Sequence, residues 1–172
     1  MDFSKFKTSD WLMVGGGAAM LILGFVLPWS TVSAFGASSS GDSPFNYLFT
    51  GGIAWILVVA VGVLAFLRAT GKLPETQPWS LIFLGATGLA VVLMLLRLIL
   101  GGRDLGFGVD ADRGIGMYGG FVWAAVAAAG AFLNFQAGGG ELSDLTDMNK
   151  VKSAFDKPDT STTPPPPPPP AQ

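Results

Sequence analysis

The chain has 172 residues, half of them hydrophobic, and a mean hydropathy of +0.51. Only 13% of its residues are charged, against about a quarter in ordinary soluble domains, and its net charge of −2 argues against a nucleic-acid-binding surface. It contains no cysteine and no histidine, which excludes disulfides, zinc sites built on thiolate or imidazole, and Ser–His–Asp or Cys–His catalysis.

Four long apolar segments dominate the sequence. The first, residues 11–29, reads WLMVGGGAAMLILGFVLPW, carries no charge, and as a helix would be about 28 Å long, roughly the thickness of a bilayer's hydrocarbon core. The others are residues 49–67, 79–100 and 117–135. A soluble core that buried all four would be too large for this chain. We therefore predict an all-α membrane protein, with an up-down bundle of four transmembrane helices within residues 11–136.

The N-terminal residues 1–10 are short and polar, and Ser9 or Asp10 is well placed to cap the first helix. Their basic character also fits a cleavable signal peptide, which stays an alternative. However, the apolar segment is longer than a typical signal sequence and ends in Pro28 and Trp29. Because tryptophan is enriched at membrane–water interfaces, we expect Trp29 to anchor a retained first span at the outer surface.

The connecting segments differ in charge. Residues 30–48 hold one acid, Asp42, and no lysine or arginine, and their SSSGDSP stretch predicts flexible coil and turn. Seven basic residues lie at the N-terminus, after the second span, and in the C-terminal segment: Lys5, Lys7, Arg68, Lys72, Lys150, Lys152 and Lys157. The first and third loops together hold only Arg103 and Arg113. Because positive loops stay inside, we predict that both termini are cytoplasmic.

Small residues at four-residue spacing predict where the helices pack closely, because lipid supplies no hydrophobic force between helices. Gly15 and Ala19 form one such pair in the first span, although single pairs of this kind are common in membrane helices. The fourth span carries the longer stripe of Gly116, Gly120, Ala124 and Ala128. We expect the fourth helix to be the one most closely surrounded by its neighbours.

Arg97 is the only formal charge inside the four predicted spans. An intramembrane arginine is a candidate contact for an anion or a substrate. It lies three residues from the end of its span, so its side chain can also reach the headgroups or pair with Asp104, Asp110 or Asp112 in the next loop. We favour this structural role. No carboxylate lies within the spans, so a proton relay or cation-coupled transporter would lack its usual residues.

Two motif matches fail on inspection. Asp110 and Asp112 begin like a calcium-binding EF-hand loop, but Gly114 stands at the third ligand position and the twelfth position holds no glutamate. Gly114, Gly116 and Gly119 match the spacing of dinucleotide-binding glycines, but a membrane helix follows them and no strand is predicted before them. We therefore predict no catalytic residue, no metal, no cofactor and no enzyme activity.

The C-terminal segment divides into two parts. Residues 137–157 form a short amphipathic segment, in which residues 141–155 predict a helix with acids early and lysines late, as the helix dipole favours. Its apolar residues at helical spacing are Leu142, Leu145, Met148, Val151 and Phe155. Residues 158–172 predict a disordered, extended polyproline II tail, in which Pro164, Pro167 and Pro170 are candidate contacts for an aromatic groove. The acidic character of the helix favours a protein partner over the inner leaflet.

A glycine-rich first helix ending in LPW, the residues Leu96, Arg97 and Gly101, and the GIGMYG stretch at 114–119 resemble uncharacterised four-helix membrane proteins of actinobacteria and their relatives. This resemblance implies a protein of the bacterial plasma membrane and brings no established activity, but it adds interest to Pro28, Trp29 and Arg97. We expect a non-enzymatic scaffold or accessory subunit whose cytoplasmic tail recruits a protein partner, with homo-oligomers through the bundle or tail as a further option. The alternative is a small transporter or channel component with Arg97 near an outer opening.

Overall fold

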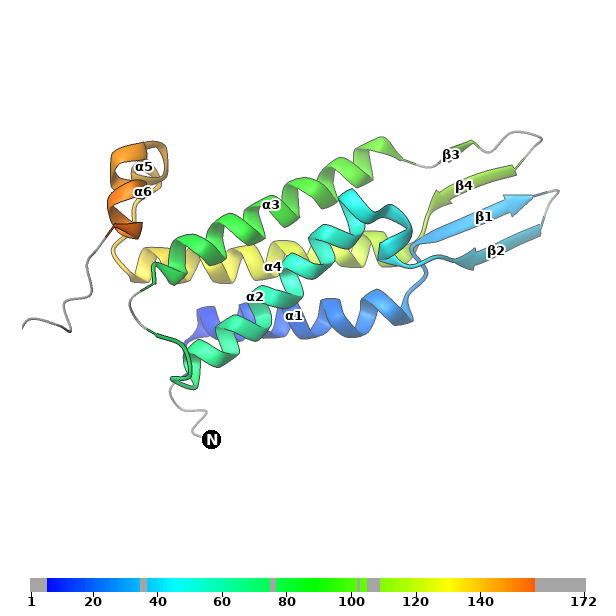
Figure 1. Cartoon of the computed structure of the whole chain (residues 1–172). Coiled ribbons are helices and arrows are strands. Elements are labelled where there is room, and N and C mark those ends of the chain that lie inside the picture. Colours follow the sequence, from blue (N-terminus) through cyan, green and yellow to red (C-terminus); the bar gives the residue numbers. More distant parts are fainter. Residues whose placement is uncertain (1–5, 35–36, 75–76, 102, 105–108, 157–172) are drawn as a thin grey trace, which may run out of the picture.

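The computed structural model describes residues 6–34, 37–74, 77–101, 103–104 and 109–156, and all structural statements below concern these residues. Four long helices dominate the fold (Figure 1): α1 (Thr8–Val26), α2 (Ile53–Ala69), α3 (Trp79–Leu100) and α4 (Ile115–Ala137). A 3₁₀ turn, Pro44–Tyr47, and a π-helical turn, Leu48–Gly52, lead into α2. Helices α1, α3 and α4, and the continuous helical stretch Pro44–Ala69 that contains α2, are each long and apolar enough to cross a membrane, which confirms the four predicted apolar helices.

Helix α1 begins and ends three residues earlier than the predicted segment. At its start, the Asp10 carboxylate accepts a hydrogen bond from the Lys7 backbone N–H at 3.0 Å, so Asp10 contributes to the cap. At its end, Leu27 is already extended, because the ring of Pro28 disfavours helical geometry in the residue before it. Trp29 therefore lies beyond the helix.

Close contacts between small residues hold α1 against two neighbours. A Cβ added to Gly17 would lie 2.8 Å from the Gly62 Cα of α2, and one added to Gly16 would lie 3.0 Å from the Ala127 Cβ of α4. Gly130 lies against Ser9 at the start of α1, and Gly116 lies against the carbonyl of Leu27 just beyond its end, so α1 and α4 run antiparallel. These contacts bring the backbones together as expected for helices in lipid.

Some of the small residues that pack between helices differ from those predicted. Gly15 is exposed, and a methyl group added there would have no atom within 4 Å, so the prediction of a packing contact at Gly15 is wrong. Consecutive residues on a helix point about 100° apart, and it is Gly16 and Gly17 that face α4 and α2. Ala19 is half-buried. In α4, Gly116, Gly120 and Ala124 are buried, but Ala128 is only half-buried and Ala127 is buried instead. Because four residues advance a helix about 40° past a full turn, residues at four-residue spacing gradually turn away from the neighbouring helix.

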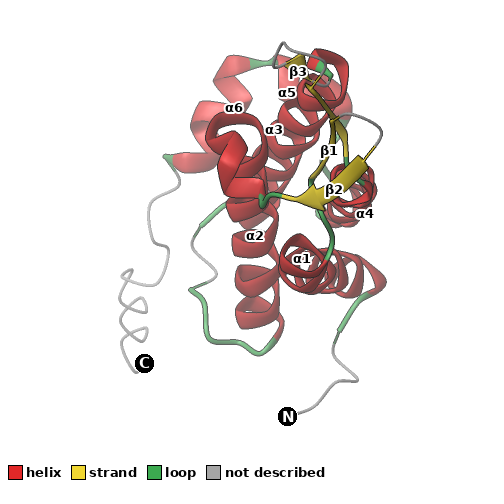
Figure 2. Cartoon of the chain, turned by 90° about the vertical axis from the view of Figure 1, so that its right-hand side faces the viewer, coloured by secondary structure: helices red, strands yellow, loops and turns green. Residues whose placement is uncertain are grey.

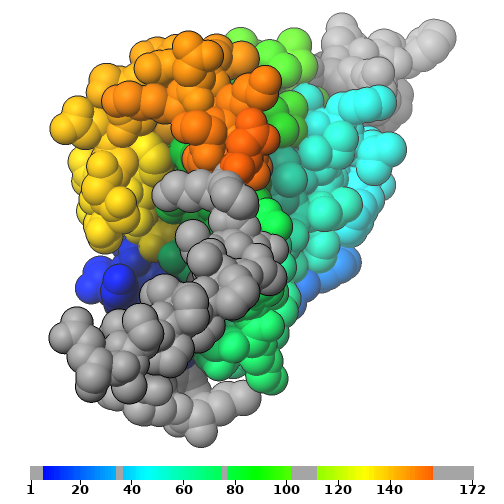
Figure 3. All heavy atoms as spheres, turned by 60° about the vertical axis from the view of Figure 1, so that its left-hand side comes forward, coloured from blue at the N-terminus to red at the C-terminus, as the bar shows by residue number. Residues whose placement is uncertain are grey.

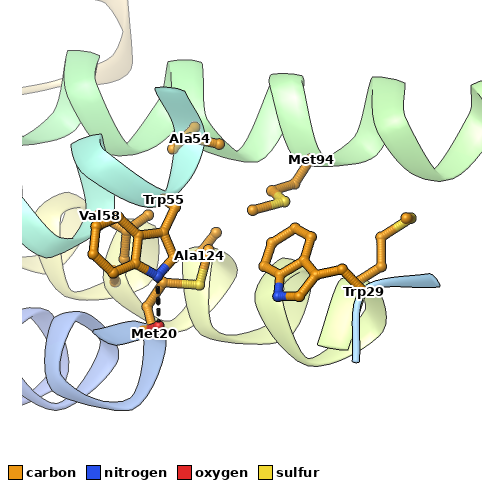
Figure 4. Close-up of a cluster of buried hydrophobic side chains, with 10 residues drawn as sticks. Met20, Trp29, Ala54, Trp55, Val58, Met94 and Ala124 are labelled. Carbon is orange, nitrogen blue, oxygen red and sulfur yellow. Dashed lines mark hydrogen bonds between the residues drawn. The ribbon is translucent and has the colours of Figure 1, made fainter. Parts of the chain in front are cut away.

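Sulfur and aromatic side chains fill the centre of the bundle (Figure 4). Met20 and Trp55 join α1 to α2, because the Trp55 indole N–H donates to the Met20 carbonyl at 2.9 Å. Met94 of α3 and Trp29 complete this buried cluster, together with small residues such as Ala124. Flexible methionine side chains suit the irregular gaps between large indole rings.

A four-stranded antiparallel sheet projects beyond one end of the helices, and Figure 2 looks at the molecule from this end. Its strands β1 (Ser30–Ala34), β2 (Ala37–Gly41), β3 (Arg103–Asp104) and β4 (Val109–Arg113) lie in the order β2-β1-β4-β3. In register, Thr31 pairs with Ser40 on one side and with Asp112 on the other. The prediction of flexible coil in this loop is therefore wrong, and the fold is not purely α-helical.

Two short helices, α5 (Leu142–Thr146) and α6 (Met148–Phe155), lie at the opposite end from the sheet (Figure 1). The prediction of one continuous amphipathic helix is wrong. Asp147 adopts an extended conformation, and its carboxylate accepts the backbone N–H groups of Asn149 at 3.0 Å and Lys150 at 3.4 Å, so it starts a second helix. The candidate residues Pro164, Pro167 and Pro170 lie outside the described residues.

Candidate functional site

Trp29 lies fully buried where α1, the sheet and α4 meet. Its indole N–H donates to the Gly24 carbonyl at 3.1 Å. The ring covers two glycines of α4, where added Cβ atoms would lie 3.0 Å from its Cδ1 at Gly116 and 3.1 Å from its Cη2 at Gly120. The prediction that Trp29 anchors the chain in the lipid interface is therefore wrong: Trp29 packs inside the protein.

The backbone around Pro28 joins the two loops. The Pro28 carbonyl accepts the N–H of Gly116 at 2.9 Å, and the Trp29 carbonyl accepts the N–H of Gly114 at 3.1 Å. A Cβ at Gly114 would collide with the Pro28 carbonyl oxygen, so this position needs glycine. Pro28 and Trp29 therefore tie the end of α1 to the start of α4, and their role in the structure is architectural.

Arg97 lies near the sheet end of α3 and places its guanidinium carbon 3.5 Å from the centre of the Tyr47 ring. This cation–π contact was not anticipated from the sequence. The Arg97 Nε is buried without a hydrogen-bond partner, and within the described side chains Arg97 forms no ion pair with Asp112. The side chains of Asp104 and Asp110 lie outside the described residues. The nearby Arg113 instead donates through Nε to the Leu98 carbonyl at 2.9 Å, which caps α3.

A cavity of about 600 Å³ opens at the other end of the bundle, between the ends of α1, α2 and α4 and the loop before α3. Its polar lining consists of Lys7, Asp10, Arg68, Gln77 and Asn134, with Trp79 and Leu73 among the apolar residues. Asn134 is 7% exposed, and its Oδ1 accepts a hydrogen bond from Arg68 Nη1 at 3.3 Å. Its amide nitrogen is buried without a partner in the described part of the chain.

Sequence reasoning missed this cavity. It used Arg68 only as a charge that sets orientation, and Asn134 only as a marker for the end of the fourth span. The two residues are 66 positions apart, so no local pattern joins them. The available signal was an arginine and an asparagine at the C-terminal ends of the second and fourth spans, which an up-down topology brings to the same end of the bundle.

The C-terminal helices lie across a groove from α3, and Figure 3 shows them in orange at the top of the view. Leu145, Val151 and Phe155 line a groove of about 480 Å³ together with α3 residues such as Leu84 and Leu89. Other apolar side chains of the same segment face solvent: Met148 is 79% exposed and Leu142 is 65% exposed. The predicted apolar residues thus divide between a groove on α3 and an open surface.

A salt bridge joins α5 to α6, in which Lys150 Nζ lies 2.6 Å from Asp144 Oδ1. The hydrogen bond from Lys150, with the backbone N–H of Glu141, lowers the pKa of the Asp144 carboxyl below its ordinary value. The same hydrogen bond and the charge of Asp144 raise the pKa of Lys150. Lys150 is exposed and Asp144 is partly exposed, so solvent screens the pair and the contact orients the two helices more than it stabilises them.

Comparisons with protein-family models, with curated proteins and with solved structures find no match for this chain. Among the described residues, no group of three or more acidic, cysteine or histidine side chains is arranged to hold a metal ion. The candidate functional regions are therefore the two ends of the bundle and the C-terminal helices.

Proposed function

We propose that the chain is a non-enzymatic, multi-pass protein of the bacterial plasma membrane, a scaffold or accessory subunit that recruits a protein partner through its C-terminal segment. In this proposal the four helices form an up-down bundle across the bilayer, and both termini are cytoplasmic. The observation that carries the proposal is the open apolar surface of Leu142 and Met148 on a segment whose two helices are joined by a salt bridge and whose second helix is capped.

The distribution of positive charge supports this orientation. Lys7 and Arg68 line the same cavity at the end of the bundle near the N-terminus. Arg97 and Arg113 lie at the sheet end. The lysines of the C-terminal segment add positive charge at the N-terminal end of the bundle, where α5 and α6 lie (Figure 1). Because positive segments are retained in the cytoplasm, the N-terminal end is assigned to the cytoplasm and the sheet to the outside.

The chemistry of the C-terminal helices defines the partner. Residues 141–156 carry four acids and two lysines, a net charge of −2, so an anionic inner leaflet would repel them. An apolar surface with acidic neighbours of this kind, carried by two short helices, fits an apolar groove with a basic rim. We therefore assign the surface around Met148 to a protein with such a groove.

A tagged full-length chain and a chain that ends at residue 140, purified from native membranes, test the proposal. The partner should be retained by the full chain and lost from the shorter one. Met148→Asp should also lose the partner, because it places a charge in the apolar surface. Asn149→Asp is the matched control, since it adds the same charge to a neighbouring exposed residue. An identical set of partners for the full and shortened chains would refute the proposal.

A second candidate, a small transporter or channel component, is favoured only by the unpartnered Arg97 Nε near the sheet end. Fully buried side chains such as Trp29, Met94 and Met117 fill the bundle, which argues against a continuous path. If this candidate is correct, Arg97→Gln will abolish flux into vesicles that contain the protein. Flux that survives the substitution would remove Arg97 from the transport path.

A further inference from the structure

The groove between α3 and the C-terminal helices has apolar walls. Its α3 wall lies within residues 81–89, and Leu145, Val151 and Phe155 form the wall opposite. All of its described lining residues are leucine, glycine, valine or phenylalanine. Ordered water needs two to four polar partners, and no side chain of this lining supplies one. The volume of about 480 Å³ therefore suits an apolar occupant.

The α3 wall continues along the helix as an exposed apolar stripe. Leu89, Val92, Leu96 and Ile99 follow one another at three- or four-residue spacing and are between 43% and 69% exposed. Helix α3 is long and apolar enough to cross a membrane, and only 22% of its apolar window is buried, the lowest share among the four spans. In a bilayer, acyl chains cover such a stripe. Because Leu89 belongs to both the stripe and the groove, the same chains have a continuous apolar path into the groove.

We propose that one acyl chain of a zwitterionic phospholipid occupies this groove, between α3 and the C-terminal helices. Gly85 and Gly88 provide the room, because a Cβ added at either position would have no atom within 4 Å. Residues 81–89 span about 12 Å along α3, and a helix about 10 Å across would need about 900 Å³ over that length. The groove has about half of this volume, so a helix of a second copy is too wide for it, whereas an acyl chain is thinner.

The charge of the C-terminal segment selects the headgroup. The side chains of residues 141–172 include five acids and three lysines, a net charge of −2, which disfavours the headgroup of an anionic lipid. The proline-rich residues 157–172 are a poorer occupant than a lipid, since an extended chain would bury unpaired carbonyl groups between apolar walls. Leu142 and Met148 do not line the groove, so lipid binding and the recruitment of a partner succeed or fail separately.

The test uses the full-length protein in maltoside micelles and a photoreactive lipid. Phosphatidylcholine with a diazirine on one acyl chain is added in increasing amounts, and the adducts formed on illumination are located by peptide mass spectrometry. Adducts should form on both walls, within residues 81–89 and within residues 145–155. Phosphatidylglycerol with the same chain should label residues 145–155 at least about three-fold less, because its headgroup is negative.

Gly88→Leu fills the groove from the α3 side. A leucine side chain takes the place of about two methylene groups, each of which contributes about four-fold to binding, so half-maximal labelling of residues 145–155 should need about ten-fold more lipid. Gly15→Leu is the matched control, because Gly15 is equally open but lies on α1 and outside the groove. It should change the half-maximal concentration less than about two-fold.

A second pair of variants carries the test if Gly88→Leu shows no cooperative unfolding transition. Val151→Asp places a charge on the opposite wall and should lower labelling as strongly, whereas the exposed Asn149→Asp should not. Adducts on α3 without adducts on residues 145–155 would overturn the proposal and leave the groove to residues 157–172 or to a second copy. Equal labelling of Gly88→Leu and Gly15→Leu would also overturn it, and equal labelling by the two lipids would refute the selection of a zwitterionic headgroup.

Discussion

Replacement of Gly17 by alanine should push α1 and α2 apart. The new Cβ would lie 2.8 Å from the Gly62 Cα and 3.1 Å from the Val58 carbonyl oxygen, whereas carbon atoms in favourable contact are about 3.5–4.0 Å apart. Relief requires a separation of about 0.7 Å, enough to lose a quarter to a half of the dispersion energy across the contact. Overpacking of this kind costs about 1–3 kcal/mol in the free energy of unfolding.

Gly15→Ala is the internal control. Gly15 lies on the same helix with no atom within 4 Å of an added methyl group, so alanine gains helix propensity there without a clash. Both variants gain that propensity, and their difference isolates the contact between α1 and α2. Reversible unfolding in mixed detergent micelles, followed by tryptophan fluorescence to which Trp55 in that interface contributes, should show Gly17→Ala less stable by about 1–3 kcal/mol. Equal stabilities would refute the proposed contact.

Two further outcomes follow from the described contacts. Gly120→Leu should lower the free energy of unfolding in detergent by about 1–3 kcal/mol more than Ala125→Leu, because only the leucine at position 120 forces atoms against Trp29. Thermal unfolding measures both losses. Equal losses would reject the packing of Trp29 on α4. The contact of Asp144 with Lys150 should weaken at acid pH, because the pKa of Asp144 is lower in the folded chain than in the unfolded one. The stabilisation from the ionised Asp144 carboxylate is therefore present above the ordinary carboxyl pKa and is lost as the pH falls through the lowered pKa. The NMR shift of the Lys150 ammonium reports this loss, and Asp144→Asn should remove the pH dependence; an unchanged titration in that variant would contradict it.

The helices were predictable because their signal is local. Length and uninterrupted apolar character mark each segment, and the structure places four helices there. The boundaries depended on finer chemistry: Pro28 ends α1 through its effect on Leu27, and the last residue of the apolar segment, Trp29, turns into the core. A tryptophan at the end of a span therefore identifies the boundary but not whether lipid or protein covers the ring.

The sheet was not predictable from the sequence. Strand β1 pairs with β4, whose residues lie about 80 positions later along the chain, and the serines of β2 show no alternation of apolar and polar residues. These strands are stabilised by backbone pairing between two loops that the helices bring together. The strands therefore depend on the arrangement of the bundle and not on a local sequence pattern. The same reason explains the missed contact of Arg68 with Asn134.

The glycine positions show a related limit. The stripe in α4 was visible because several small residues share it, whereas three consecutive glycines in α1 offered three equally good faces. The identity of the neighbour decides among them: Gly16 contacts Ala127, Gly17 contacts Gly62, and Gly15 remains exposed. Because each residue turns the helix by about 100°, a prediction that is wrong by one residue selects an exposed position instead of a packed one.

Orientation in the membrane underlies the proposed recruitment of a partner in the cytoplasm, and one measurement tests it directly. A reporter enzyme that is active only outside the cytoplasm is fused to Gln172, and the same reporter is inserted at Ser39 in the exposed strand β2 as the matched control. The account predicts an inactive reporter at Gln172 and an active one at Ser39. An active reporter at Gln172 would place the C-terminus outside and contradict the account.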